Sequence, residues 1–189
     1  AIMEAYVLGK APIPFGNPQT ITAWVKNGGT NTMLSAACTL TITGANSFTN
    51  VQTFPTLTSG DSVLITFAPF SPANVGINNV EVTLPPDDNP LNNIKTKIIE
   101  TNANSYSYAQ GPTPSGGVGF NGATGDFIAK FTTSSTQSIN QVNVNFANFG
   151  QPFQIGIWAA NAAGTPGALI HSTPTYTSTL GEYTVLIDP

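Results

Sequence analysis

The stretch Thr20-Ile21-Thr22-Ala23-Trp24-Val25-Lys26-Asn27-Gly28-Gly29 decides the fold class of this chain. Ile21, Ala23 and Val25 alternate with polar or aromatic side chains, which is the period of a β-strand with one buried face. The residues Asn27-Gly28-Gly29 then end the alternation, as expected where a strand reaches a turn. The stretch therefore predicts a short β-strand, and an all-β protein if the pattern recurs.

The pattern recurs along the first hundred residues. Alternating runs interrupted by turn residues cover 40–42, 48–54, 63–67, 80–84 and 94–98. In the last run Ile94, Thr96 and Ile98 alternate with Lys95 and Lys97, which are expected on the opposite face. A series of short strands at intervals of about 8–12 residues is typical of an immunoglobulin-like sandwich. We therefore expect an immunoglobulin-like β-sandwich over residues 1–101.

A second module is expected after a break. The alternation stops near Thr101, and residues 102–125 form a predicted linker and Gly/Pro-rich loop. The glycines at 116, 117 and 119 are not followed by the lysine of a phosphate-binding loop. Strand patterns resume over 127–131, 142–146, 153–157, 169–170 and 183–187. Residues 126–189 are therefore expected to form a jelly-roll-like β-sandwich that is incomplete within this chain.

The composition excludes some classes of partner. Charged residues make up 7% of the chain, arginine is absent, and the net charge is −4. Phosphate contacts need clusters of Lys and Arg, so we expect no nucleic-acid partner. Since no window approaches about 18 consecutive apolar residues, we do not expect the chain to span a membrane. A chain that begins at Ala1 without an initiating Met fits a processed or excerpted polypeptide.

Catalytic chemistry is not visible in the sequence. Cys38 is the only cysteine, and its apolar surroundings are typical of a small buried core residue. A catalytic thiol needs a base within reach, but the only histidine, His171, belongs to the other predicted module. His171 also has neither a second histidine nor an acidic residue nearby. We therefore predict a protein that is not an enzyme and carries no cofactor.

The densest acidic group is Asp87-Asp88, with Asn89, Asn92 and Asn93 close behind it. Carboxylate and amide oxygens in a loop are ligands that Ca²⁺ accepts, so Asp87 and Asp88 are weak candidate calcium ligands. The loop lacks the alternating ligands and the terminal glutamate of an EF-hand. The favoured alternative is an Asx-rich turn in which these side chains cap backbone amides.

The two tryptophans are candidate binding residues. Trp158 is expected opposite Ile155 and Ile157, and Trp24 is expected opposite the apolar face of its own strand. An exposed indole on a sandwich face can stack on a sugar ring. The alternative is a ring buried beneath a loop or against a neighbouring module. An exposed aromatic platform at either residue would favour carbohydrate binding, and burial of both rings would remove its basis.

The first module resembles a known family. Ile21-x-Ala23-x-Val25-x-Asn27-x-Gly29-Thr30, Leu57-x-x-Gly60-x-x-Val63 and Asp88-x-x-x-x-Asn92-Asn93 resemble motifs of the cell-adhesion-related bacterial domain (CARDB) family. The resemblance covers residues 1–101 and implies an immunoglobulin-like fold without a disulfide. Such domains serve as repeats or spacers in large bacterial and archaeal surface proteins.

The second module also resembles known proteins. Gly125-Asp126-Phe127-Ile128-Ala129-Lys130-Phe131, Ile155-Gly156-Ile157-Trp158 and Gly164-Thr165-Pro166-Gly167 resemble modules of large secreted Bacteroidetes proteins, commonly exported by the type IX system. In those proteins the segment ending near Ile187 lies mid-domain, which implies that this chain is part of a longer polypeptide. The resemblance also implies that Ser62, within Asp61-Ser62-Val63, is a candidate O-glycosylation site.

These observations lead to an expected role outside the cell. We predict a structural or adhesive region of a large bacterial secreted or cell-surface protein, acting as a spacer or assembly module. Its partners would be neighbouring domains of the same polypeptide or other surface-assembly subunits, because edge strands with so few lysines are poorly protected against pairing. The alternative is an accessory carbohydrate-binding module of a secreted hydrolase.

Overall fold

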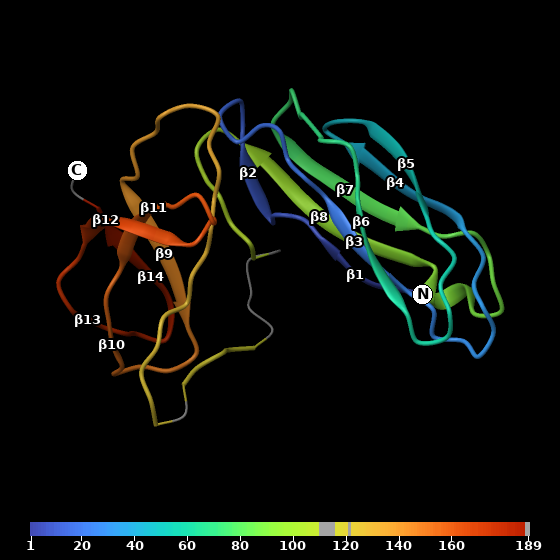
Figure 1. The fold of residues 1–189 in the computed structure, drawn as a ribbon. Helices are drawn as coiled ribbons and strands as arrows, with labels where there is room; N and C mark the ends of the chain where they lie inside the picture. Colours follow the sequence, from blue (N-terminus) through green and yellow to red (C-terminus); the bar gives the residue numbers. More distant parts are fainter. Residues whose placement is uncertain (110–115, 121, 188–189) are drawn as a thin grey trace. The chain divides into compact units, whose positions relative to one another are not determined.

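The computed structural model describes residues 1–109, 116–120 and 122–187 (Figure 1). Within these ranges the regular structure consists of β-strands and one short 3-10 helix, η1 (Pro90–Asn92), and there is no α-helix. The predicted all-β class is therefore confirmed. Among the described residues, no helix is long and apolar enough to cross a membrane.

The contacts divide the described chain into two compact units. The first unit contains 1–109 and Thr132–Ser135, and the second contains 116–120, 122–131 and 136–187. The predicted linker and loop over 102–125 includes 110–115 and 121, which lie outside the described residues, as do the last two residues of the predicted second module. The predicted domain boundaries stay a prediction.

The first unit is a β-sandwich of two sheets. The smaller sheet has the order β1 (Ile2–Tyr6), β3 (Thr22–Lys26), β6 (Ser62–Thr66). The larger sheet has the order β2 (Lys10–Pro12), β8 (Ile94–Asn102), β7 (Gly76–Thr83), β4 (Ala36–Gly44), β5 (Phe48–Phe54). Every pairing is antiparallel except that of β2 with β8, which is parallel. Figure 1 shows the two layers.

Strand alternation builds the core of the first unit. On β4, Cys38, Leu40 and Ile42 are fully buried, whereas the threonines between them lie on the outer face of the sheet. Leu40 and Ile42 are paired with Val82 and Val80 of β7, which are also buried. Burial of one such aliphatic side chain contributes about 1.5–3 kcal/mol. One contiguous core cluster extends from Ile2 to Ile99 and holds the two sheets together.

Strand β8 alternates as expected, with Ile94, Thr96 and Ile98 on one face and Lys95 and Lys97 on the other, but the isoleucine face is the outer one. Ile94 and Ile98 are exposed on the outer face of the sheet, and the core residues of β8 are Ile99 and Thr101. The physical reason lies in the partner strand, because Lys97 pairs with the buried Val80 and therefore shares its face. The lysines occupy the core-facing side of β8 at the margin of the sandwich.

Three charged contacts lie at two edges of the sandwich. Lys97 Nζ lies 2.9 Å from Glu4 Oε1 on β1, and Lys95 Nζ lies 3.9 Å from Glu4 Oε2. On β2, Lys10 Nζ lies 3.4 Å from Glu100 Oε2 on β8. Charged side chains and prolines are the features that discourage edge strands from pairing with other chains. Both β1 and β2 carry at least one of them.

The second unit consists of three two-stranded antiparallel pairs. β9 (Gln141–Phe146) pairs with β14 (Gly181–Leu186), β10 (Pro152–Phe153) with β13 (Tyr176–Thr177), and β11 (Gly156–Ala160) with β12 (Pro166–Ser172). Phe146, Phe153, Tyr176 and Tyr183 form a cluster with ring centroids 4.6–5.9 Å apart. All four rings are only partly buried. This unit is β-structure, as expected, but its core is small.

Two predicted strands of the second unit are wrong. Residues 127–131 form no strand, and Phe127 packs its ring on Phe120 at 4.9 Å instead of joining a sheet. The predicted strand 153–157 is broken, because Ile155 bonds to Thr173 and belongs to neither β10 nor β11. The Thr173 N–H donates to the Ile155 carbonyl, and the Ile155 N–H donates to Thr173 Oγ1, both at 3.0 Å.

Candidate functional site

Trp24 lies at the centre of the three-stranded sheet, on its outer face. Its cross-strand neighbours are Glu4 on β1 and Leu64 on β6. The residue is 36% exposed, while Ala23 and Val25 beside it are fully buried in the core. The sheet therefore presents an indole flanked by one carboxylate and one aliphatic side chain.

Glu4, the cross-strand neighbour of this indole, is held in place by two hydrogen-bond donors and a second nearby ammonium group. Lys97 donates to Glu4 Oε1, Lys95 lies near Oε2, and the Ala5 N–H donates to Oε1 at 3.0 Å. The hydrogen bond from Lys97 is the main cause that lowers the pKa of Glu4, with smaller contributions from Ala5 and from the lysine charges; partial burial opposes the shift. Sequence analysis missed this cluster, because its members are separated by about ninety positions and no local pattern connects them.

Trp158 lies on β11 of the second unit and is 44% exposed. A Cβ placed on Gly156 would lie 2.0 Å from the Trp158 ring, so the indole lies over the glycine backbone. Its cross-strand neighbour Leu169 is exposed as well. The Trp158 ring is therefore in contact with Gly156 on its own strand and is partly open to solvent.

Asp87 lies in an exposed turn before η1. Its Oδ1 accepts the Asn89 N–H at 2.8 Å and the Asn93 Nδ2–H at 2.9 Å, and these two bonds lower the pKa of Asp87, that from Asn89 more strongly. This is the geometry of an Asx turn. Asp88 is exposed. Asn92 and Asn93 also have buried amide oxygens without a hydrogen-bond partner, and the calcium alternative stays a prediction.

Ser62 is the first residue of β6 and is exposed. It lies opposite Lys26 of β3 and directly follows Asp61. The Asp61 carboxylate accepts hydrogen bonds from the backbone N–H and the hydroxyl of Thr58, which fixes the turn before the strand. The hydroxyl of Ser62 is therefore accessible, although its modification stays a prediction.

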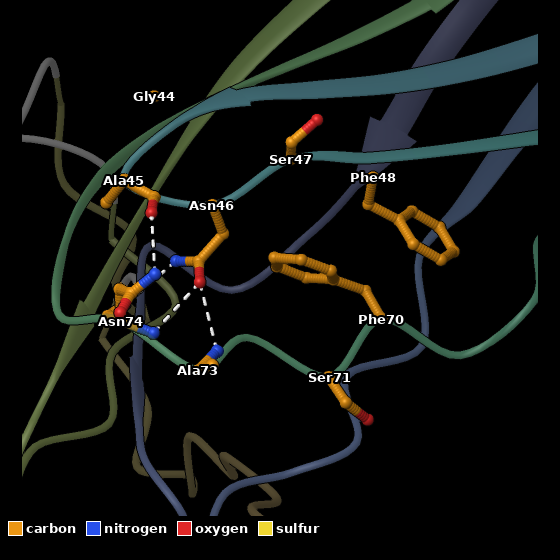
Figure 2. Close-up of a pocket in the computed structure, with 9 residues that line it drawn as sticks. All are labelled: Gly44, Ala45, Asn46, Ser47, Phe48, Phe70, Ser71, Ala73 and Asn74. Carbon is orange, nitrogen blue, oxygen red and sulfur yellow. Dashed lines mark hydrogen bonds between the residues drawn. The ribbon is translucent and has the colours of Figure 1, made fainter.

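A shallow open pocket with a volume of about 470 Å³ lies at one end of the sandwich (Figure 2). Figure 2 shows the Asn46 amide directed toward the loop at 73–74, with the rings of Phe48 and Phe70 beside it. Asn46 Oδ1 accepts the N–H groups of Ala73 and Asn74, both at 2.9 Å. The side chain of Asn46 thus joins the β4–β5 turn to the loop before β7. We therefore interpret the pocket as the space around this connection and not as a ligand site.

The single cysteine and the single histidine lie in different units. Cys38 is fully buried on β4, and loss of solvation raises the pKa of its thiol to about 11. His171 lies on β12 opposite Ile157. Within the described ranges, no three side chains of the His, Cys, Asp and Glu types gather where a metal ion could be held.

Comparison with known proteins assigns no family and no function to this chain. No known protein-family profile matches the chain. No characterised protein matches it by sequence. Among solved structures, a Paenibacillus sp. cycloisomaltooligosaccharide glucanotransferase, in complex with cycloisomaltoheptaose, is similar to 55% of this chain, with 18% identity and a TM-score of 0.42. This chain spans 14% of the length of that enzyme. A likeness of this size assigns neither an activity nor a ligand.

Proposed function

We propose that this chain is a non-catalytic structural or adhesive region of a large bacterial protein at the cell surface, acting as a spacer or assembly module. The observation that carries the proposal is the surface of the second unit. Phe149, Ile170, Leu180 and Leu186 are each more than two-thirds exposed or close to it, whereas Val185 and Ile187 are the buried aliphatic residues of this unit. Large apolar side chains with this exposure are available for contact with other protein segments.

The proposal also states where this region lies: within a longer, exported polypeptide. The CARDB-like motifs of the first module and the Bacteroidetes-like motifs of the second support a position within an exported polypeptide. Neighbouring domains or other subunits would then cover the apolar side chains of the second unit. The sandwich of the first unit, with its continuous core, would act as a rigid element between contacts.

Isolation of the native polypeptide tests this proposal. We expect an intact mass far above 19.6 kDa, tryptic peptides that continue past Pro189, and recovery from the surface fraction of the source cells. A polypeptide of 19.6 kDa recovered from the cytosol would contradict the proposal.

A second candidate function is carbohydrate binding, and the exposure of both tryptophans favours it. Trp24 is the better platform, because its cross-strand neighbour Glu4 carries a carboxylate that accepts hydrogen bonds from hydroxyl groups. The test is calorimetric titration with neutral oligosaccharides, comparing the Trp24→Ala and Trp158→Ala variants. Loss of binding in one variant alone would identify the site, and absence of binding to the unmodified chain would reject this candidate.

A further inference from the structure

Strand β5 ends the five-stranded sheet and has β4 as its one strand partner. In an antiparallel pair, alternate residues direct their N–H and C=O groups away from the partner strand. In the part of the chain that the structure describes, the β5 backbone bonds outside β4 only through the Phe54 carbonyl, which accepts the Ser35 hydroxyl at 2.7 Å. The outer edge of β5 is therefore available for pairing.

This edge lacks the protection found on the other end of the same sheet. β2 has only three residues and contains Lys10 and Pro12, whereas β5 has seven residues and contains no charge, no proline and no glycine. Long, uncharged edge strands of high β-propensity pair with strands of other chains. The edge strand β6 of the other sheet is also uncharged, but it is two residues shorter than β5.

The sequence of β5 is nearly the same in both directions. Phe48-Thr49-Asn50-Val51-Gln52-Thr53-Phe54 reads Phe-Thr-Gln-Val-Asn-Thr-Phe when reversed. Antiparallel pairing of two copies about Val51 would place Phe opposite Phe, Thr opposite Thr and Asn opposite Gln. Such cross-strand pairs each stabilise a sheet by about 0.2–1 kcal/mol, and like charges never meet. This is the self-complementarity that a two-fold symmetric interface requires.

The two faces of the strand match as well. Thr49, Val51 and Thr53 lie exposed on the outer face of the sheet, and Val51 is 54% exposed. Phe54 is buried in the core, and Phe48 packs against Phe70 with ring centroids 5.5 Å apart. A two-fold axis that is normal to the sheet and lies between the two copies of Val51 keeps the outer face of both copies on one side. On the inner face, Asn50 Oδ1 accepts the Ala68 N–H at 3.0 Å and the Gln52 side-chain N–H at 2.9 Å, bonds that leave the outward backbone groups of β5 unoccupied.

We propose that two copies of this chain associate by antiparallel pairing of β5 with β5 about Val51, which joins their five-stranded sheets into one. The inference rests on the proposed assembly function and names both the partner and the contact. The free energy comes from backbone hydrogen bonds along the edge and from the matched cross-strand pairs.

Disulfide trapping in the full-length chain tests the pairing and its register. Directly opposed residues of an antiparallel pair have Cα atoms about 4.5–5.5 Å apart, which matches disulfide geometry. Val51→Cys is therefore expected to form a covalent dimer on oxidation, while the buried Cys38 of the unmodified chain forms none. Thr49→Cys alone is expected to form no dimer, because in this register two copies of position 49 lie about 14 Å apart along the strands. A mixture of Thr49→Cys and Thr53→Cys chains is expected to form one.

Two control variants distinguish disulfides formed by edge pairing from disulfides formed by random encounters between exposed thiols. Ile77→Cys introduces a thiol on the same outer face, on the interior strand β7, and Leu64→Cys introduces one on the other uncharged edge, β6. Trapping at Val51 no faster than at Ile77 would overturn the inference. Trapping at Leu64 and not at Val51 would overturn it too, because it would show that β6 is the pairing edge.

Sedimentation equilibrium supplies an independent measurement without new thiols. Val51→Lys places two like charges opposite each other, and we expect the dissociation constant to rise by at least about tenfold. Ile77→Lys, equally exposed on the same face, is expected to leave it unchanged. Equal thermal midpoints of the two variants establish that both remain folded. An unmodified chain that stays monomeric at millimolar concentration overturns the dimer and leaves the surface-protein proposal to its own test of mass and location.

Discussion

Asn78 and Asn46 are joined by two hydrogen bonds to one oxygen: Asn78 Oδ1 accepts the backbone N–H of Asn46 at 2.8 Å and its side-chain N–H at 3.0 Å. Asn78 is fully buried on β7, and its Nδ2 donates to the Ile99 carbonyl and to Thr101 Oγ1, both at 3.2 Å. One amide thus connects the β4–β5 turn, across β7, to β8 at one end of the sheet. Buried polar groups of this kind are stabilising only while every partner is satisfied.

We predict that Asn78→Ala lowers the free energy of unfolding by about 3 kcal/mol, because it leaves buried donors and acceptors on Asn46 and Thr101 without partners. Urea unfolding followed by circular dichroism measures the change. The matched control is Asn79→Ala, since Asn79 is the next residue on β7 and faces solvent; we expect a change within about 0.5 kcal/mol. Equal losses of unfolding free energy in the two variants would show that the buried Asn78 amide stabilises the fold no more than an exposed asparagine does.

The contact between Glu4 and Lys97 predicts a pH dependence. Since the folded-state pKa of Glu4 lies below its usual value near 4.5, the stability from this contact is present above that value and is lost as pH falls through the lowered pKa. Its size is limited to about 0.5 kcal/mol, because both side chains are partly exposed. Carboxyl-carbon NMR titration of Glu4 in the Lys97→Met variant should show the pKa rising.

Lys26→Met is the control for that titration, because Lys26 forms none of the ion pairs of Glu4. The Glu4 pKa is expected to stay lowered in this variant. A Glu4 pKa that is the same in all three proteins would mean that the contact with Lys97 does not persist in solution.

The buried thiol of Cys38 predicts slow reaction with a disulfide reagent. Its pKa of about 11 and its full burial leave little accessible thiolate at pH 8, so labelling by a disulfide reagent should proceed only when the first unit opens. The rate is expected to rise by orders of magnitude in 6 M urea. Rapid labelling of the native chain would show that β4 is not held in a closed core.

The position of Trp158 over Gly156 predicts a fluorescence change. Gly156→Ala would place a Cβ where the indole lies, so the ring must move into solvent and its emission should shift to longer wavelength. In a Trp24→Phe background Trp158 is the only tryptophan, and excitation that tyrosine does not absorb makes it the reporter. Gly28→Ala in the same background is the control, because no atom lies within 4 Å of its added Cβ. An unchanged spectrum in Gly156→Ala would contradict the stacked ring.

Modification at Ser62 can be tested in the native source. If the resemblance to Bacteroidetes exported proteins holds, peptides that contain Asp61-Ser62-Val63 should carry a glycan mass. The Ser62→Ala chain expressed in the same cells should lack it and should otherwise fold as before, since Ser62 is exposed. Unmodified peptides from the native protein would reject the site.

Local alternation was sufficient for the strands that form the core of the first unit. Leu40, Ile42 and Val82 were placed on strands by period alone, because a half-buried strand must alternate. On β8 the alternation was correct as well, but it did not reveal which face is buried; the pairing of Lys97 with the buried Val80 decides this. Alternation failed at Ile155, because its hydrogen bond to Thr173, eighteen residues away, interrupts the strand there.

The candidate site was only partly within reach of sequence reasoning. Exposure of Trp24 follows from its position opposite Ala23 and Val25 and could be foreseen as one of two alternatives. The carboxylate beside it could not, because Glu4 reaches this position through the pairing of β1 with β3. The buried amides of Asn46 and Asn78 could not be predicted either, since nothing local in the sequence distinguishes a buried asparagine from an exposed one.

The far end of the larger sheet sets the stoichiometry of any assembly built through β5. Lys10 on β2 is engaged with Glu100, and Pro12 has no N–H to donate, so this margin is a poor template for a further strand. Two copies joined at β5 therefore present only β2 margins at the outside of their common sheet. Growth by this route ends at a closed pair and does not continue into a filament.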